Sequence, residues 1–420
     1  MSDKVKILYI SHSPYYNGAE LSLFNLVKHI NWELYEPVVI FPYEGPLVNE
    51  MKSQNIKIYI TPLERWIRYI FDEPVKNTSL FERIQKIIEV IEKENIDIVH
   101  SNTSVIFEGA VAANIKKIPH IWHVHEFLKE NRELHPCLPL RNIFDMMSIL
   151  SKKIVCVSNY NKEQFKVIDD KRKLVTIYNG VSESKNSENC GILKKKLNIT
   201  DEELISVTVG FLTKNKGYPD LLNAVALVRK EIDNMRFFWV GASLKSDLRE
   251  FKYFKKKLDL KDIVNYLGFR RDVSGILNCS DLLICSSLNE AFPLVILEAM
   301  SAGLPIITTN WGGASECVIN NVTGFIVPVG DSGKLSEKII ELARNNTKRK
   351  LMGENARKHF RDNFNLKKFV EQFEKLYSVV LNNMSTITLS INENNILNTF
   401  LNTYEEISDN HWKNLKKEKK

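Results

Sequence analysis

Apolar and polar residues alternate along most of the chain in a way that predicts short buried strands, each followed by a helix. Residues 5–10 predict a first strand, and the apolar positions between 19 and 30 have helical spacing. The alternation continues with strands expected near 36–41, 56–60, 96–100, 119–124, 153–158 and 174–178, and helices near 45–54, 78–94, 104–116, 139–151 and 160–168. This order is typical of a mainly parallel sheet covered by helices on both faces.

A second series of the same kind begins at residue 204. Strands are expected near 204–210, 236–241, 263–267, 281–286, 305–309 and 324–328, with helices near 218–233, 246–258, 272–279, 293–302 and 312–319. Asp331 is a suitable N-cap for a following helix, and two more helices are expected at 347–363 and 366–382. We therefore predict an α/β protein with two Rossmann-like, doubly wound domains, 1–182 and 200–364, joined by a polar linker at 183–199.

Composition narrows the class of protein without changing this organisation. The 420 residues are 44% hydrophobic and carry a net charge of +7, which fits a phosphate-bearing ligand but is no nucleic-acid footprint. No apolar run reaches the length of a membrane-spanning helix, and the first residues lead directly into a strand, so neither a signal peptide nor a membrane span is expected. The six cysteines lack metal-binding spacing and are expected to be reduced, buried thiols of a cytoplasmic protein.

The stretch from 281 to 300 places two carboxylates around the start of a helix. Pro293 stands where the helix is expected to begin, Glu290 lies in the loop before it, and Glu298 lies about one and a half turns into it. Free amides at a helix N-terminus bind anions, whereas Glu290 beside them suits a neutral hydroxyl-bearing group. Glu298 suits a vicinal diol such as a ribose. A nucleotide-sugar has all three chemical groups, although two solvated glutamates beside a turn would show the same spacing.

The run around these glutamates resembles the E-x7-E signature of retaining glycosyltransferases of the large family 4. The matching residues are Glu290, Phe292, Pro293, Glu298, Ala299 and Met300. The resemblance covers roughly residues 5–380 and implies the GT-B fold, in which two Rossmann-like domains bind ligands in the cleft between them. It also implies that a helix at 365–383 crosses back to the N-terminal domain. The polar and basic tail at 384–420 lies outside the family pattern, and we expect at most one helix there and a mobile segment.

Further elements of the family pattern follow other strands. The Asn17-Gly18-Ala19-Glu20 loop resembles the family's Gly-Gly-x-Glu loop, near the donor phosphate and the acceptor, with Asn17 in place of the first glycine. The Trp122-His-Val-His-Glu126 segment resembles the element whose histidine orients the sugar. His125 matches best, with His123 as the second choice and a structural role as the alternative for either.

The loop after the first strand of the second domain carries two lysines. Lys216 and Gly217 match the family's Gly-Arg-Leu-x-x-x-Lys-Gly pattern, whereas Phe211 replaces its arginine. The resemblance implies that Lys216, helped by Lys214 and by the main-chain amides around the Phe292-Pro293-Leu294 segment, binds the diphosphate. Without the two glutamates, these lysines would be read as exposed loop residues.

The resemblance assigns the remaining donor contacts. Phe269 lies in a Gly-Phe segment whose backbone meets the nucleotide base, Glu298 holds the ribose, and Glu290 holds sugar hydroxyls. No Asp-x-Asp motif follows a strand, so we expect no required metal or cofactor beyond the donor, a UDP- or GDP-sugar. The mechanism of retention is left open.

The acceptor side is less clear from the sequence. A glycan or lipid-linked acceptor in cell-envelope polysaccharide synthesis is the expectation, with peripheral contact at the inner face of the membrane. The aromatic segment at 66–71, flanked by Arg65 and containing Arg68, is either a surface for such contact or a packed loop, the latter being favoured. A GT-B sugar-nucleotide epimerase and a non-catalytic scaffold binding a partner protein or membrane remain as alternatives.

Overall fold

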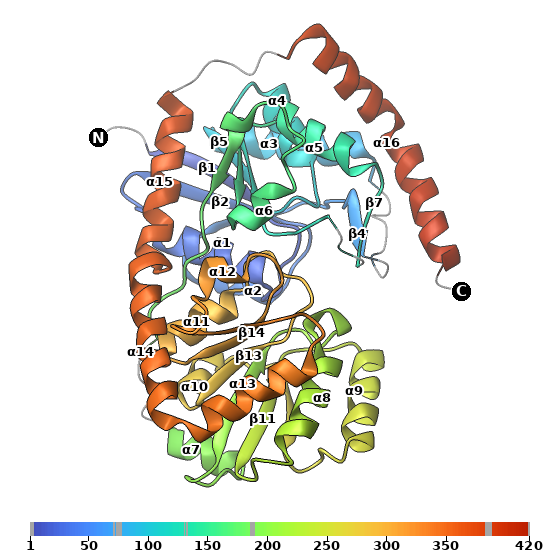
Figure 1. Cartoon of the computed structure of the whole chain (residues 1–420). Coiled ribbons are helices and arrows are strands. Elements are labelled where there is room, and N and C mark those ends of the chain that lie inside the picture. The colour runs from blue at the N-terminus through green and yellow to red at the C-terminus, as the bar shows by residue number, and fades with distance from the viewer. Residues whose placement is uncertain are drawn as a thin grey trace. The chain divides into compact units, whose positions relative to one another are not determined.

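The chain forms two compact units (Figure 1), which are described separately. The computed structural model describes residues 4–69, 72, 78–129, 131, 133–184, 190–382 and 389–418. Unit 1 consists of residues 1–178 together with 369–420, and unit 2 consists of residues 179–368. Each contains one large parallel sheet with helices on its faces, so the predicted α/β fold with two Rossmann-like domains is confirmed.

The sheet of unit 1 has seven parallel strands in the order β3-β2-β1-β5-β6-β8-β9. The strands are β1 (Val5–Ile10), β2 (Tyr35–Phe41), β3 (Lys57–Ile60), β5 (Ile98–Ser101), β6 (His120–Val124), β8 (Lys153–Cys156) and β9 (Leu174–Thr176). The helices are α1 (Gly18–His29), α2 (Pro46–Ser53), α3 (Leu80–Glu94), α4 (Glu108–Ile115), α5 (Leu140–Ile149) and α6 (Asn159–Glu163). The strand order reverses between β1 and β5, which is where ligands bind in doubly wound sheets.

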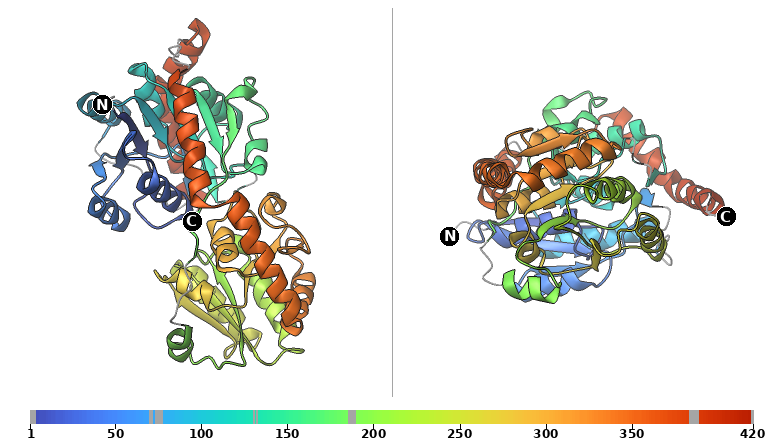
Figure 2. Two further views of the ribbon diagram at one scale, coloured as in Figure 1. Left: turned by 90° about the vertical axis from the view of Figure 1, so that its left-hand side faces the viewer. Right: turned by 60° about the horizontal axis from the view of Figure 1, so that its bottom comes forward.

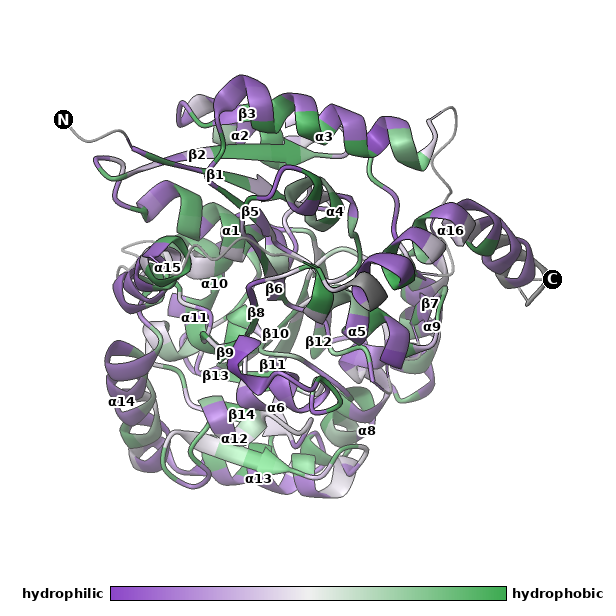
Figure 3. Cartoon of the chain, turned by 90° about the horizontal axis from the view of Figure 1, so that it is seen from above, coloured by the Kyte–Doolittle hydropathy of each residue, from purple (hydrophilic) through white to green (hydrophobic). Residues whose placement is uncertain are grey.

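Local sequence explains why these elements start and stop where they do. Ser79 accepts a hydrogen bond from the Glu82 amide while the Glu82 carboxylate accepts one from the Ser79 amide, a capping box that begins α3. Asn95 ends the same helix in the left-handed conformation. Figure 3 shows hydrophobic residues along β1 and β2 and polar residues on the outer side of α3, as expected for strands buried between helices.

The sheet of unit 2 has six parallel strands in the order β12-β11-β10-β13-β14-β15. The strands are β10 (Leu204–Val209), β11 (Met235–Val240), β12 (Val264–Gly268), β13 (Leu282–Cys285), β14 (Ile306–Thr309) and β15 (Gly324–Val327). The helices are α7 (Cys190–Lys196), α8 (Tyr218–Val228), α9 (Lys245–Lys257), α10 (Val273–Asn278), α11 (Leu294–Ala302), α12 (Ala314–Cys317), α13 (Ser332–Arg344) and α14 (Asn346–Asn363). Here the order reverses between β10 and β13.

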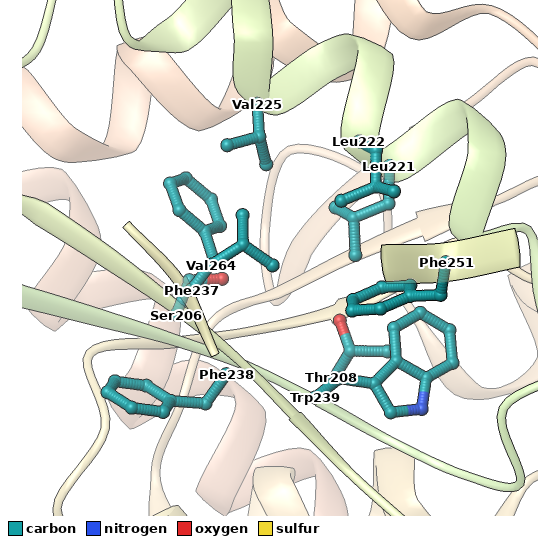
Figure 4. A pocket seen from close by; sticks show the side chains of 10 residues that line it. All are labelled: Ser206, Thr208, Leu221, Leu222, Val225, Phe237, Phe238, Trp239, Phe251 and Val264. Carbon is teal, nitrogen blue, oxygen red and sulfur yellow. The ribbon is translucent and has the colours of Figure 1, made fainter. Parts of the chain in front are cut away.

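The large hydrophobic cluster of unit 2 lies between this sheet and helices that include α8, α9 and α13. Figure 4 shows the aromatic and aliphatic side chains that surround a small cavity there, among them Phe237, Trp239 and Phe251. The cavity has a volume of about 10 Å³, room for a single water molecule at most. It is therefore a packing defect of the hydrophobic core and not a ligand site.

Two helices that follow unit 2 in the chain complete unit 1. Helix α15 (Leu366–Asn382) crosses the strands of unit 1 (Figure 2), where the Tyr377 hydroxyl donates a hydrogen bond to the Tyr9 hydroxyl at 3.1 Å. Helix α16 (Ile391–Glu418) buries Leu397, Phe400 and Tyr404 in the core of unit 1. The expectation of a mobile tail is thus corrected for residues 391–418, because regularly spaced apolar side chains fix this helix to the unit.

A disulfide corrects the expectation that all six cysteines are reduced. Cys190 of α7 is bonded to Cys279, next to α10, with a Cα–Cα distance of 5.2 Å. Cys156, Cys285 and Cys317 are free and buried, as expected, and Cys137 is free and half-buried. Cys190 lies within the predicted linker at 183–199, so the disulfide fixes this segment to the helical layer of unit 2.

A small antiparallel sheet was not predicted from the sequence. It pairs β4 (Ile67–Tyr69) with β7 (Leu134–Pro136) in unit 1.

Among the described residues, no helix has the length and hydropathy needed to cross a membrane.

Candidate functional site

Two loops of unit 2 meet where its strand order reverses. One follows β10 and the other follows β13, and the Leu288 amide donates a hydrogen bond to the Asn215 carbonyl at 2.8 Å. Gly217 makes this approach feasible, since its φ is +71° and a Cβ atom there would lie 1.8 Å from the Ser286 carbonyl oxygen. The Ser286 hydroxyl also donates to the Lys216 carbonyl at 2.9 Å. Only glycine fits this position, and the contact brings the predicted lysine loop against the predicted glutamate loop.

The contact between the loops places Lys216 next to Glu290. The ammonium group of Lys216 forms a salt bridge with Oε1 of Glu290, and the Ser287 hydroxyl donates to the same oxygen at 2.7 Å. Their side chains are 28% and 13% exposed, so both reach solvent at the end of the sheet. The structure therefore brings together two of the predicted site residues that stand 74 positions apart in the chain.

Glu298 occupies a different environment on α11. Its side chain is half-buried, and burial raises the pKa of its carboxyl group to about 7. Among the described residues, Glu298 has no hydrogen-bond or salt-bridge partner. A half-buried carboxylate without a partner is costly unless a ligand supplies hydrogen-bond donors.

The start of α11 presents backbone groups rather than side chains. Pro293 is the N-cap residue, one position earlier than predicted from the preference of proline for the first turn, and it makes no side-chain cap hydrogen bond. Phe292 and Leu294 are buried, and Phe292 packs against Phe364 with 5.6 Å between ring centroids. Their predicted contribution to anion binding thus rests on main-chain amides, as is usual at a helix N-terminus.

The other predicted donor-binding residues of unit 2 are Lys214 and Phe269. Lys214 is 62% exposed and forms a salt bridge of 2.9 Å with Glu250 of α9, so its charge is already balanced in the free protein. Phe211, which replaces the family's arginine, is exposed, and Phe269 after the edge strand β12 is also exposed. These positions reach solvent after the carboxyl ends of two strands, β10 and β12, which lie on either side of β11.

In unit 1, His125 lies at the carboxyl end of β6. Its Nε2 is 3.2 Å from Oδ1 of Asn102, whose amide donates to the Ala19 carbonyl of α1 at 2.9 Å. Burial lowers the pKa of His125 to about 3, so the ring is neutral at physiological pH. Gly18 begins α1, and an added Cβ would have no atom within 4 Å, so the position is open for close approach by a ligand.

His123, the second choice from the sequence, is a core residue. It is fully buried, and its ring lies 4.9 Å from that of Phe373 in α15. Glu126 also has a structural role, because its carboxylate accepts hydrogen bonds from the Thr103 hydroxyl and from the amide and hydroxyl of Ser104. Of these residues, His125 alone is left as a candidate for ligand binding.

Two further polar residues of unit 1 were missed by the sequence analysis. Glu20 is fully buried, and its Oε1 lies 3.4 Å from Nδ1 of His12. Their positions in the sequence could have drawn attention to them. His12 lies in the loop after β1, and Glu20 stands inside the recognised Gly-x-Glu segment. Glu20 was named only as part of the loop at 17–20 and was given no role of its own.

The aromatic segment beginning at Trp66 is packed, as favoured from the sequence. Trp66 is fully buried and donates a hydrogen bond to the Ser104 carbonyl at 2.7 Å, and Arg68 is 2% exposed. Ile70 and Phe71 lie outside the described residues. The described part of the chain also contains no group of three or more His, Cys, Asp or Glu side chains arranged to hold a metal ion.

Comparison with known proteins agrees with this architecture. Residues 16–185 match the model of Glycosyltransferase Family 4, and residues 191–359 match that of Glycosyl transferases group 1. An uncharacterized glycosyltransferase of Methanocaldococcus jannaschii, MJ1178, is 30% identical over 370 residues, which cover 87% of this chain and 95% of the relative.

Two more relatives have more informative names. The UDP-Gal:alpha-D-GlcNAc-diphosphoundecaprenol alpha-1,3-galactosyltransferase of Escherichia coli is 27% identical over 392 residues, covering 89% of this chain and 97% of the relative. The crystal structure of HepE from Anabaena in complex with UDP and glucose has a TM-score of 0.77 at 22% identity, covering 89% of this chain and 99% of HepE. Taken with the two parallel-sheet units, these matches show that the chain belongs to the glycosyltransferases of the GT-B fold, with a Glycosyltransferase Family 4 region followed by a Glycosyl transferases group 1 region.

Proposed function

We propose that this chain transfers a sugar from a UDP-sugar to a hydroxyl group of a glycan or lipid-linked acceptor, with retention of anomeric configuration. The names of the E. coli relative and of the HepE complex support the choice of UDP over GDP. The name of the E. coli relative, with its diphosphoundecaprenol-linked sugar, supports a lipid-linked acceptor. We propose that this acceptor belongs to polysaccharide synthesis at the cell envelope, with peripheral membrane contact. The E-x7-E spacing of Glu290 and Glu298 supports retention.

The observation that carries this proposal is the partnerless carboxyl group of Glu298 at the reversal point of the unit 2 sheet. In the free protein, the described residues supply no donor to it, and burial penalises its charge. The two hydroxyl groups of a ribose would supply both donors at once. Ribose binding therefore gives this side chain the hydrogen bonds that the fold leaves unmade.

The salt bridge between Lys216 and Glu290 suits a site that exchanges partners when the donor binds. A diphosphate would take the ammonium group of Lys216, and the released Glu290 carboxylate would then accept hydrogen bonds from sugar hydroxyls. The Ser287 hydroxyl, 2.7 Å from Oε1, would keep the carboxylate in place throughout. In the free protein each charge is compensated by the other, so the site is not left with an unpaired lysine or glutamate.

Stabilisation of the leaving diphosphate is proposed to require no metal ion. Lys216, with Lys214 as a second cation, and the main-chain amides around Phe292–Leu294 would offset the developing charge. Neutral His125 is proposed to orient the transferred sugar from unit 1. Phe269 and Gly18 are proposed to lie beside the base and the phosphates, respectively.

Calorimetric titration with UDP, GDP, dTDP and ADP, each with magnesium and with EDTA, tests the donor site. We expect micromolar binding of UDP that is unchanged by EDTA. Glu298→Ala should weaken it about 10-fold or more, because hydrogen bonds to a charged group are each worth about 1.5–3 kcal/mol. Glu337→Ala, at an exposed glutamate of α13, is the matched control. No binding of any diphosphate would overturn the proposal and favour a scaffold.

Turnover separates the two glutamates and the two classes of enzyme. With a UDP-sugar and a pool of octyl glycosides, Glu290→Ala should lower transfer more than it lowers UDP affinity. Nuclear magnetic resonance of the product should show the donor's α configuration at the new linkage. A β linkage would refute retention alone, whereas an epimerised UDP-sugar without transfer would favour the epimerase.

A further inference from the structure

A histidine and a buried glutamate lie together at the reversal point of the unit 1 sheet. His12 follows β1, Glu20 lies in the first turn of α1, and the neighbouring strand is β5. This is the position in unit 1 that corresponds to the Lys216–Glu290 pair in unit 2. The proposed donor site makes no use of either residue.

The distances show how the pair is arranged. Nδ1 of His12 lies 3.4 Å from Oε1 of Glu20, and the Ser11 hydroxyl donates to the same oxygen at 3.3 Å. Nδ1 of His12 and Oε2 of Glu20 are buried without a hydrogen-bond partner among the described residues. The glutamate side chain is fully buried, whereas 12% of the histidine side chain is exposed. Glu20 therefore cannot reach a ligand directly, but His12 can.

The second nitrogen of His12 is the atom that a ligand would meet. Nε2 is not among the enclosed partnerless atoms, and none of the described residues makes a hydrogen bond to it. One ring nitrogen thus faces an internal carboxyl group while the other is open to solvent. This is the arrangement by which a carboxylate fixes the orientation and tautomer of a functional histidine.

The charged and titratable neighbours determine which form of the pair is present. Arg65, before β4, lies near enough to affect the pKa of both Glu20 and His12. After β6, Glu126 affects the pKa of Glu20 and His125 affects that of His12, and the charge of Glu20 affects the pKa of Tyr43 after β2. Burial raises the pKa of Glu20 to about 7, and burial together with Arg65 and His125 keeps the pKa of His12 well below its usual range. His12 is therefore neutral, and above neutral pH an ionised Glu20 can accept a hydrogen bond from a proton on Nδ1 of His12. Nε2 is then left with a free lone pair.

We propose that His12 binds the acceptor, its Nε2 accepting a hydrogen bond from the attacking hydroxyl group, and that Glu20 is the positioning residue that fixes its tautomer. This assignment rests on the proposed glycosyl transfer. In that step the hydroxyl oxygen bonds to the anomeric carbon and the bond from this carbon to the diphosphate breaks. The hydroxyl proton, hydrogen-bonded to Nε2 before the reaction, passes to the departing diphosphate. His12 orients the hydroxyl and does not keep the proton, since its imidazole is too weak a base.

Comparing transfer with hydrolysis of the same donor tests the role of His12, because water needs no acceptor site. The probes are UDP-galactose or UDP-glucose, whichever is hydrolysed faster, and a pool of octyl glycosides of N-acetylglucosamine, glucose, galactose and mannose. His12→Ala should lower transfer about 10-fold, the loss of one well-placed hydrogen bond, with hydrolysis and UDP affinity nearly unchanged. His12→Gln should restore part of the transfer, since its amide oxygen can accept the same hydrogen bond. His29→Ala, at an exposed position of α1, is the matched control.

The tautomer provides a readout that does not depend on turnover. Nuclear magnetic resonance of nitrogen-15-labelled histidine, with His12 identified from the His12→Gln spectrum, should show at pH 8 a proton on Nδ1 and none on Nε2. Glu20→Gln, whose amide can donate to Nδ1, should move the proton to Nε2 and lower transfer as much as His12→Ala does.

Three outcomes would overturn the assignment of His12 and Glu20. They are equal loss of hydrolysis and transfer in His12→Ala, unchanged transfer in that variant, or a proton on Nε2 of the wild type at pH 8. Absence of UDP binding by the wild-type protein is a separate result, which refutes the proposed function and the acceptor assignment with it.

Discussion

At the scale of single residues, the two glutamates of the 290–298 segment are held in opposite electrostatic states. Glu290 is compensated by Lys216 and Ser287, whereas Glu298 on the next helix is half-buried without a partner in the described structure. The pKa of Glu298 is consequently raised to about 7 by desolvation. The carboxyl group of Glu298 is thus partly protonated at neutral pH. A ligand that donates hydrogen bonds to it would lower its pKa and favour its ionised form.

This difference predicts that donor affinity depends on pH through Glu298. The raised pKa means that the group is protonated below about pH 7, and only the ionised form accepts two ribose hydrogen bonds. Affinity for a UDP-sugar should therefore increase as the pH is raised from 6 to 8. Calorimetry should show this rise for the wild-type protein and for Glu337→Ala, and a weak, flat affinity for Glu298→Gln. A similar pH dependence in Glu298→Gln would assign the titration to another group.

The sequence identified several of these residues but not their relationships. Glu290, Glu298 and Lys216 were found because each follows a strand in a recognisable local pattern. The salt bridge between Lys216 and Glu290 was not foreseen, because it depends on two loops that meet only in the folded sheet. His12 was missed for a similar reason, since its proximity to Glu20 depends on how the loop after β1 folds back against the start of α1.

At the scale of elements, α16 shows how a polar sequence can form part of a core. Phe400 contacts Trp66 and Phe107 with ring-centroid distances of 6.0 and 5.1 Å. Ser408 of the same helix accepts a hydrogen bond from Arg68 at 2.5 Å, and Arg68 in turn pairs with Glu64. Helix α16 therefore closes both a hydrophobic cluster and a buried ion-pair network of unit 1.

Phe400→Ala should detach or loosen α16, since replacing a buried phenylalanine by alanine costs about 3–5 kcal/mol. Cys137 packs against the same core cluster, and burial raises the pKa of its thiol to about 12, so it is protected from thiol reagents in the native state. We expect the variant to react with Ellman's reagent much faster than the wild type, and Cys137→Ser in the same background to abolish the increase. Ile396→Ala, at an exposed position of α16, is the matched control. Equal rates in Phe400→Ala and wild type would show that α16 does not protect this region.

The long, strongly periodic elements could be predicted, and the short or isolated ones could not. Helices such as α14 and α15 were placed within one residue at each end, because apolar positions recur over several turns. The β4–β7 pair escaped notice because each strand has three residues, too few to show a period of two. The tail at 384–420, rich in asparagine and threonine, was expected to hold at most one helix, as it does, and to be mobile. The packing of α16 could not be foreseen because its partners lie some 300 residues earlier in the chain, as with the 340-residue separation between Arg68 and Ser408.

At the scale of the whole molecule, the Cys190–Cys279 disulfide is the covalent feature that local patterns did not reveal. It joins positions 89 residues apart within unit 2 and so restricts the unfolded chain. Loop-closure entropy for this length corresponds to about 4.6 kcal/mol in the chain-entropy model. Urea unfolding should show a lower midpoint for Cys190→Ser and Cys279→Ser, and reductant should lower the midpoint of the wild type but not of these variants. Cys137→Ser, which removes a free thiol of unit 1, is the control, and a wild type insensitive to reductant would contradict the prediction.

Unit 1 is built from two separated stretches of the chain, 1–178 and 369–420, and this has a consequence for synthesis in the cell. A ribosome releases the chain from the N-terminus, so the residues of unit 2 emerge before Tyr377 and Tyr404 can enter the core of unit 1. Unit 2 can thus finish folding before unit 1, although most of unit 1 is synthesised first. Until translation reaches the last two helices, the nascent N-terminal sheet exposes an apolar surface that chaperones would be expected to protect.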